Sequence, residues 1–386
     1  MYKLLAHIQG DRGLWAVVFL FMLFSFLPVY SASSNLAYAY SGGNTFSYLI
    51  KHLFFVFSGL SIIYLIHKVD PVYFRNIGTI LLLTSLVLLI AVLWQGDTIG
   101  GANASRWIRL PFIQITFQPS EIAKLALILY LSRALVKHKD KLHSFKESFI
   151  PIVSPILMVV ILILPANFST AALIGIISMI LLFVGGYPFK HLIKLGFIGV
   201  GFLGLFLLLV MAFPDAMPNR VETWKARIEN YQDGDSESNY QVEKSKIAIA
   251  SGHFLGQGPG KSIQKNFLPQ SSSDFIYAII VEEGGLVFGF GVVGFYLIFL
   301  IRILKIAHQV TDTFGVLVVI GMGFSVVFQA LLNMGVAVNI FPVTGQTLPF
   351  ISSGGTSLWI TCLGMGVVLS ISKQMQKKKI IVDEQA

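Results

Sequence analysis

The chain has little charge and almost no cysteine. Only 12% of its 386 residues are Asp, Glu, Lys or Arg, whereas soluble domains carry about 25%. Hydrophobic residues make up 55%, so the composition excludes a soluble globular protein and predicts an integral membrane protein. The single cysteine, Cys362, excludes an internal disulfide and a cysteine-based metal site. No pair of histidines has the spacing of metal ligands. The net charge of +9 would suit nucleic-acid binding in a soluble protein. In a membrane protein, the distribution of basic residues between the loops reports the orientation of the chain instead. No nucleic acid is therefore expected as a partner.

Long apolar runs dominate the sequence, and each membrane helix needs about 20 such residues. We expect an all-α, polytopic membrane protein with about ten transmembrane helices. They are predicted near 14–31, 46–66, 76–95, 120–136, 149–166, 170–187, 191–213, 275–301, 312–338 and 356–373. The first run is long for a signal peptide, so we expect it to be retained as a helix. Because no internal repeat is evident, we predict a single transmembrane domain spanning 1–386.

The basic residues predict how the chain is oriented. An even number of spans places both termini on the same side, and most of the 28 Lys and Arg residues fall in the termini and in alternate connections. Basic residues favour the cytoplasmic side, so both termini are expected to be cytoplasmic. The opposite side then holds a large extracytoplasmic loop at 214–273, between helices 7 and 8. Loops of this length are usually functional or disordered.

The stretch Gln270 to Glu283 places acids where they are costly. Asp274 stands where the long loop enters an apolar run, and Glu282 and Glu283 lie within that run, about 12 Å deeper along a helix. Ionisable residues inside a membrane are functional-site candidates. Asp274 could instead cap the helix, and Glu282 and Glu283 could form an internal ion pair.

A second set of polar residues surrounds the outer connections. Arg106 could grip a phosphate with two hydrogen bonds, although Arg106 with Trp107 could also be an interfacial anchor. Glu121 and Lys124 share a helix face at a spacing of three residues and could be only a local salt bridge. The remaining candidates come from the long loop and from the start of the last helix: Arg220, Lys261, Lys265, Ser352, Gly354 and Gly355. Hydroxyls and glycines at a helix start suit an anion site, and tight turns explain them equally well.

Four ordered motifs together resemble the SEDS family of bacterial cell-wall proteins (shape, elongation, division and sporulation), the FtsW/RodA/SpoVE type. They are Gly10-Asp11-Arg12, then Arg106-Trp107 before FQPSEIAKLA at 117–126, then LGQGPGKSIQKNFLPQSSSDFIYAIIVEEGG at 255–285, and NMGVAVNIFPVTGQTLPFISSGGTSL at 333–358. The resemblance covers essentially the whole chain. Gln264-Lys265 resembles the FtsW/SpoVE branch more than RodA.

The resemblance implies a peptidoglycan glycosyltransferase that polymerises lipid II with inversion and releases undecaprenyl pyrophosphate, in cell division and cell-shape control. It implies that Asp274 is catalytic, as a general base. Substrate contacts are expected from Arg106, Trp107, Glu121, Lys124, Arg220, Lys261, Lys265, Glu282, Ser352, Gly354 and Gly355. A divalent cation, Mg²⁺ or Mn²⁺, is expected as cofactor, and no organic cofactor. The expected partners are a class B penicillin-binding protein with transpeptidase activity and the division or elongation machinery, in the bacterial cytoplasmic membrane. A lipid II flippase and a non-catalytic partner of a wall enzyme remain alternatives.

Overall fold

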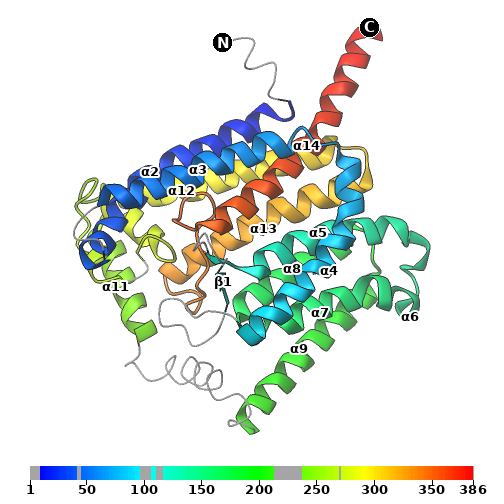
Figure 1. Ribbon diagram of the computed structural model, residues 1–386, viewed down its shortest axis with the longest axis horizontal. Helices are drawn as coiled ribbons and strands as arrows, with labels where there is room; N and C mark the ends of the chain where they lie inside the picture. The colour runs from blue at the N-terminus through cyan, green and yellow to red at the C-terminus, as the bar shows by residue number, and fades with distance from the viewer. Residues whose placement is uncertain are drawn as a thin grey trace. The chain divides into compact units, whose positions relative to one another are not determined.

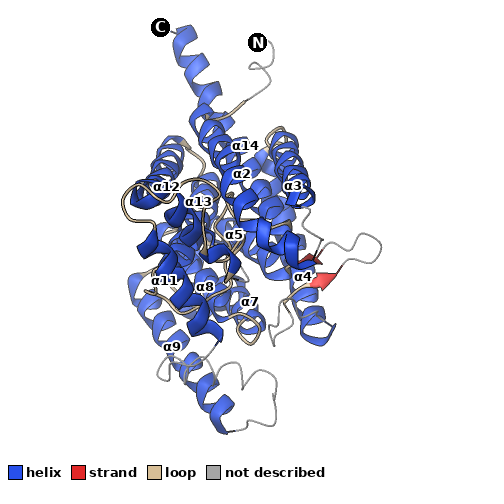
Figure 2. Cartoon of the chain, turned by 90° about the vertical axis from the view of Figure 1, so that its left-hand side faces the viewer, coloured by secondary structure: helices blue, strands red, loops and turns tan. Residues whose placement is uncertain are grey.

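The computed structural model describes residues 9–40, 45–95, 106–109, 116–212, 237–268 and 271–385. Helices dominate it (Figure 1). In chain order the longer ones are α2 (Arg12–Tyr40), α3 (Thr45–Ile66), α4 (Pro71–Gln95), α5 (Pro119–Lys137), α7 (Ser154–Ile163), α8 (Phe168–Val184), α9 (Phe189–Ala212), α11 (Glu237–Ser251), α12 (Ile276–Gln309), α13 (Thr313–Ala337) and α14 (Thr356–Gln385). Within the described ranges, the strands are β1 (Ile108–Arg109) and β2 (Thr116–Phe117), which pair antiparallel (Figure 2).

The predicted spans all fall on helical segments. Seven of the described segments are long and apolar enough to cross a membrane, and α8 is a shorter apolar helix. The predicted fourth and seventh spans coincide with α5 and α9. The prediction of an all-helical, polytopic membrane protein is therefore confirmed.

The fifth and sixth spans are divided where the sequence indicated. The fifth begins earlier than predicted, at the short helix α6 (Phe145–Ser148), and continues through a π-helical turn (Phe149–Val153) into α7. Pro151 lies in that turn, which fits the absence of its N–H. Asn167 then caps α8, because its side-chain oxygen accepts a hydrogen bond from the Thr170 N–H at 3.2 Å.

One helix has no counterpart among the predicted elements. α11 lies in the long loop at 214–273, and it packs against α12. Its buried side chains include Val242, Ser245 and Ala248, each three residues from the next. That stripe is the helical signal in the sequence, but it is too short and polar to stand out beside the membrane spans. Residues 213–236 and 269–270 of the same loop lie outside the described residues.

The chain divides into two compact units, each made of discontinuous segments. Unit 1 comprises Met1–Pro71, Glu237–Thr311 and Met322–Ala386, and unit 2 comprises Val72–Ser236 and Asp312–Gly321. One division between them falls inside α13, and another follows the first residue of α4. The prediction of a single domain stays a prediction.

Unit 1 is built from α2, α3, α11, α12 and α14 together with most of α13. α2 packs on both α3 and α12, and α3 packs on α14 (Figure 1). Small residues allow the α3–α14 approach: a Cβ added at Gly59 would meet the Cys362 sulfur at 2.9 Å, and one at Gly366 would meet the Ile66 Cβ at 2.7 Å. Close packing through small residues is a common way for membrane helices to associate.

α12 is broken at Gly285. This residue has φ 70° and ψ −173°, so the helix hydrogen-bond pattern is interrupted there. The loop after α11 supplies the missing partners: the N–H groups of Gln257 and Gly258 donate to the carbonyls of Glu282 and Glu283 at 3.0 and 2.9 Å, and the Leu286 N–H donates to the His253 carbonyl at 3.0 Å. Backbone groups away from water need such partners, so loop and helix form one structural piece.

Unit 2 packs α5 against α7 and α8, with α4 beside α5. A Cβ added at Gly78 of α4 would meet the Leu129 Cβ at 3.1 Å. The Tyr130 hydroxyl of α5 donates to the Pro151 carbonyl at 3.0 Å. Arg75 and Asp312 form a partly exposed ion pair at 2.8 Å.

We predict that Gly256→Ala destabilises the protein more than Gly260→Ala. Both glycines have φ near +80° (79° and 77°), but a Cβ at Gly256 would lie 2.2 Å from the Glu283 carbonyl oxygen, and one at Gly260 would meet nothing within 4 Å. Gly260→Ala is therefore expected to lower the free energy of unfolding only by the cost of a left-handed backbone, about 1–2 kcal/mol. Gly256→Ala carries the same cost and must also displace the loop from α12. Thermal unfolding in detergent measures the difference. Equal melting temperatures for the two variants would contradict this role of the loop.

Candidate functional site

Asp274 lies in a turn immediately before α12. The turn covers 271–275, the N-cap position of the helix is occupied by Phe275, and that residue forms no side-chain capping bond. Asp274 therefore stands one residue outside the capping position. Its neighbours Ser271, Ser272 and Phe275 are buried, and Asp274 itself is partly exposed. The fold thus places a carboxylate within reach of solvent on a buried support.

Three consecutive carbonyls hold that support in place. The Ser353 N–H donates to the Ser272 carbonyl at 2.9 Å, and the Ser352 hydroxyl donates to the Ser273 carbonyl at 2.6 Å. The side-chain amide of Asn333, from α13, donates to the Asp274 carbonyl at 2.7 Å. These bonds fix the backbone on both sides of Asp274, which restricts the positions that its carboxylate can take.

The same partners connect the turn to the loop before α14. Asn333 donates a second hydrogen bond to the Gln346 carbonyl at 2.7 Å, and the Ser352 hydroxyl accepts one from the Leu348 N–H at 2.8 Å. The sequence analysis did not select Asn333, although an amide inside an apolar span is a signal that could have found it. Asn333 is 1% exposed, so it acts through the backbone of Asp274.

The residues predicted as an anion site before α14 have different surroundings. Ser352 is buried and bonded as described. Gly354 and Gly355 are partly exposed, and Gly355 has φ +52°, a conformation that favours glycine and here precedes the first turn of α14. Ser352 thus contributes to holding Asp274, and a substrate contact by the three residues stays a prediction.

Glu282 is fully buried and anchors the loop that precedes it. Its carboxylate accepts hydrogen bonds from the Ser262 hydroxyl and from the N–H groups of Ile263 and Gln264, the latter two at 2.9 and 3.2 Å. These bonds satisfy the buried carboxylate and tie the loop to α12. The recorded partners are a hydroxyl and backbone amides from the loop, not the cation of a second helix.

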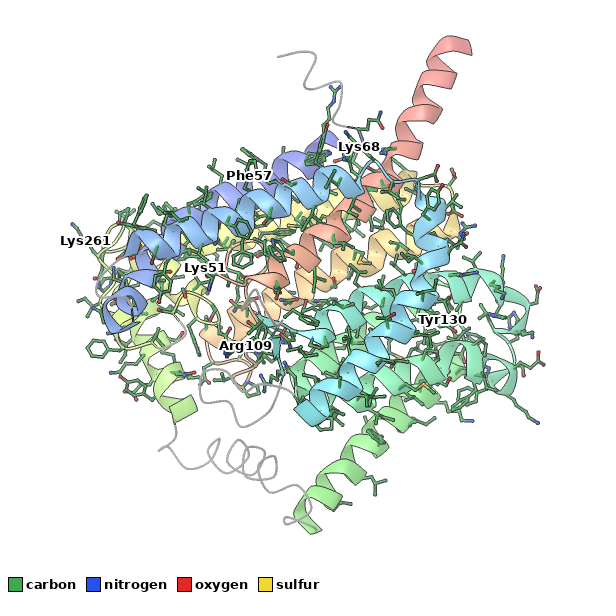
Figure 3. The ribbon with its side chains drawn as sticks, viewed as in Figure 1. Lys51, Phe57, Lys68, Arg109, Tyr130 and Lys261 are labelled. Atoms are coloured by element: carbon green, nitrogen blue, oxygen red, sulfur yellow. The ribbon has the colours of Figure 1, made fainter. Side chains whose placement is uncertain are left out.

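Glu283 connects α12 to α2 and, through a serine, to Lys265. It accepts from the Ser31 hydroxyl and from the Ser262 N–H at 3.3 Å. The Lys265 ammonium donates to the Ser31 oxygen at 3.1 Å and to the Gly260 carbonyl at 2.7 Å. Lys265 is thus part of this network, whereas Lys261 is exposed on the same loop (Figure 3).

The second set of predicted residues belongs to unit 2. Glu121 and Lys124 form the expected pair, with Lys124 Nζ 2.8 Å from Glu121 Oε2 and both side chains buried. Arg106 donates through Nε to the Ala166 carbonyl at 2.7 Å. Trp107 is partly exposed just before β1. Arg220 lies outside the described residues.

The comparisons with known proteins agree on one family. The model of the FtsW/RodA/SpoVE cell cycle proteins matches residues 11–377. The probable peptidoglycan glycosyltransferase FtsW of Trichlorobacter lovleyi is 33% identical over 368 residues, which cover 94% of this chain and 93% of the relative. The stage V sporulation protein E of Bacillus subtilis is 30% identical over 366 residues, with 94% and 97% covered.

Two solved structures share the fold over nearly the whole chain. A chain of the structure described as "Structural coordination of polymerization and crosslinking by a peptidoglycan synthase complex" has a TM-score of 0.73 at 26% identity, covering 95% of this chain and 98% of that one. The rod shape determining protein RodA of Thermus thermophilus has a TM-score of 0.67 at 25% identity, with 95% and 97% covered. With a family model that matches almost its full length and relatives above 30% identity, the chain belongs to the FtsW/RodA/SpoVE family of cell cycle proteins.

Proposed function

We propose that the protein is a peptidoglycan glycosyltransferase that polymerises lipid II, with Asp274 as the general base. The observation that supports this role best is the fixed turn at 271–275, which presents a partly exposed carboxylate on a backbone held at three consecutive carbonyls. Relatives named probable peptidoglycan glycosyltransferase FtsW support the activity.

In the proposed reaction, a hydroxyl of the acceptor sugar attacks the anomeric carbon of the donor sugar. Asp274 accepts the proton of that hydroxyl as the new C–O bond forms. The bond from the anomeric carbon to the diphosphate breaks with inversion, and undecaprenyl pyrophosphate leaves with the electron pair.

The leaving diphosphate requires positive charge and hydrogen-bond donors. We propose that Lys261 and Lys265, on the loop anchored by Glu282, supply these groups. Arg106 and Lys124 are proposed substrate contacts in their own right. Trp107, Arg220, Gly354 and Gly355 remain proposed contacts, and Glu121 acts by pairing with Lys124.

A divalent cation would add charge neutralisation at the diphosphate. Among the described residues, no group of three His, Cys, Asp or Glu side chains gathers as a metal site. Mg²⁺ is often held by one or two carboxylates together with substrate phosphates. Asp274 is the carboxylate of the candidate site that fits such a shared arrangement, so we propose that Mg²⁺ or Mn²⁺ binds with the substrate.

We propose that the reaction takes place on the outer side of the bacterial cytoplasmic membrane, with both termini in the cytoplasm. The distribution of Lys and Arg supports this orientation. A class B penicillin-binding protein is the proposed partner, because one related chain comes from a complex described as coordinating polymerization and crosslinking. We propose that the division or elongation machinery recruits this protein together with that partner.

We predict that Asp274→Asn abolishes polymerisation and leaves the fold intact. The amide keeps the size of the side chain but cannot accept the proton, so the rate should fall by at least ~10²-fold. The assay follows glycan polymer on a gel after incubation of lipid II with the purified protein and its partner in detergent containing Mg²⁺. Ser353→Ala is the matched control, because Ser353 is exposed and contributes its backbone N–H.

Other outcomes of this assay would reject the proposed function. Polymer that depends on the partner and is made equally by Asp274→Asn would indicate a non-catalytic role. Wild-type protein that makes no polymer in detergent but moves lipid II across vesicle membranes would indicate a flippase.

We predict that Glu282→Gln weakens the protein mainly by releasing the loop at 257–268. Glutamine presents an NH₂ group where three donors point at one carboxylate, and hydrogen bonds to charged groups contribute about 1.5–3 kcal/mol each. A lower melting temperature and faster proteolysis within the loop are expected. The exposed Glu243→Gln on α11 serves as control. A Glu282→Gln protein of wild-type stability that makes no polymer would instead place Glu282 in the chemistry.

A further inference from the structure

Two connections of unit 2 meet at one end of its helices. One leads from α5 through α6 to α7, and the other, at 185–188, joins α8 to α9. The Ser148 and Tyr187 hydroxyls are hydrogen-bonded at 2.8 Å, and His191 Nε2 donates to the His143 carbonyl at 3.0 Å. These bonds hold the start of α9 beside α6.

The ring of Phe145 lies at this junction. It contacts the His191 ring at a centroid distance of 5.5 Å and the Phe149 ring at 6.0 Å. Lys194 Nζ lies over the same ring, 4.1 Å from its centroid. Because an ammonium above an aromatic face is attracted by the negative charge of that face, Phe145 restricts where the Lys194 charge can lie.

Both connections bring lysines to the junction. Lys190 and Lys194 are four residues apart on α9 and therefore share a face of that helix. Lys146 follows Phe145 directly on α6. All three lysine side chains are exposed. Lys146, Lys190 and Lys194 are named the lysine cluster below.

Positive charge is in excess around the lysine cluster. Three further lysines stand at the end of α5 and in the turn after it: Lys137, Lys139 and Lys141. The acids of the same connections are Asp140 and Glu147, and within the described range 116–212 no recorded ion pair joins either acid to these lysines. The pKa of His138 is lowered by burial and further by the charges of Lys137 and Lys141. A neighbouring side chain thus experiences the excess positive charge.

The start of α9 also presents large apolar side chains. Phe189 is 67% exposed, Ile193 47% and Phe197 75%, and they are interleaved along the helix with Lys190 and Lys194. Since α9 coincides with the predicted seventh span, the two lysines stand where that span begins. Lysines at the end of a span reach towards the headgroup layer, and neighbouring apolar side chains remain in the hydrocarbon.

We propose that the lysine cluster binds the headgroup of an anionic phospholipid of the surrounding bilayer. The ammonium groups pair with the anionic headgroup, and the apolar side chains at the start of α9 contact the acyl chains. An acidic peptide matches the charge but leaves those apolar side chains uncovered, so the observations favour a lipid. This binding does not depend on glycosyl transfer, and the proposed orientation puts it in the cytoplasmic leaflet.

Equilibrium binding tests the site without any turnover. The full-length protein in detergent is titrated with a fluorescent short-chain phosphatidylglycerol and with the phosphatidylcholine of the same chain length. The two lipids share their acyl chains and their phosphate, but phosphatidylcholine has no net charge. Phosphatidylglycerol should therefore bind at least ~10-fold more tightly. Equal affinity for the two lipids overturns the proposal.

Two competitors identify the source of the anionic group. Inorganic phosphate carries negative charge without acyl chains, and a poly-glutamate peptide carries it on a polypeptide. At matched ionic strength, neither should displace phosphatidylglycerol when added at the lipid concentration that half-saturates the protein. Displacement by phosphate would show a site for free anions, and displacement by the peptide would show a surface for an acidic protein. Either result overturns the lipid site.

Charge removal assigns the binding to the lysine cluster. Lys190→Gln and Lys194→Gln should each raise the apparent Kd for phosphatidylglycerol roughly 3–10-fold, and the double variant should raise it further. Because both side chains are exposed, the melting temperature without lipid should stay unchanged. An unchanged Kd in the double variant rejects the site.

Matched controls separate the cluster from charge alone. Lys244 of α11, in unit 1, also lies over aromatic rings, with Nζ 5.2 Å from the Tyr240 centroid and 5.4 Å from that of Phe267. Lys244→Gln removes the same charge and should leave the Kd unchanged. Phe145→Leu keeps every charge but removes the ring below Lys194, so the Kd should rise roughly 2–5-fold. A loss of affinity in Lys244→Gln equal to that in Lys194→Gln overturns the assignment to the cluster.

Discussion

The candidate site depends on supplying hydrogen-bond partners to the backbone where α12 begins and where it is broken. A continuous helix satisfies its own N–H and C=O groups, but a break does not, and lipid offers no replacement. At Gly285 the loop after α11 supplies the partners, and before α12 the turn at 271–275 receives them from Asn333, Ser352 and Ser353. Both irregular segments flank the same short helical stretch, 276–284, which carries Glu282 and Glu283. The candidate site is thus assembled where the chain departs from regular helix.

The buried acids serve this arrangement by binding the loop. Glu282 accepts hydrogen bonds from one hydroxyl and two backbone N–H groups. Glu283 accepts them from the Ser31 hydroxyl and from one further backbone N–H. A carboxylate that collects several donors avoids most of the cost of burial. Asp274 differs in that its side chain is partly exposed and that its turn is held through the backbone carbonyls of Ser272, Ser273 and Asp274. Two buried carboxylates therefore anchor the loop, whereas the third, at Asp274, lies at the surface of the candidate site.

The sequence predicted what depends on local pattern. Apolar runs located the spans and the gap between α7 and α8, and the spacing of Glu121 and Lys124 predicted their pair. It did not predict the partners of Glu282 or the bond from Asn333 to Asp274, because these join segments that are separated in the chain. Asn333 lies 59 positions from Asp274, and no periodicity records such a contact. α11 was missed for another reason: its buried stripe is short and its composition is polar.

The network around Glu282 and Glu283 also bears on how the chain is made. Synthesis proceeds from the N-terminus, so Ser31, Ser262 and the amides of Ile263 and Gln264 have all left the ribosome before the two acids do. Every recorded partner of both carboxylates therefore precedes them in the chain. When α12 enters the membrane, the donors that bind its two acids have therefore already been synthesised. This order shortens the time for which either carboxylate would face lipid without a hydrogen-bond partner.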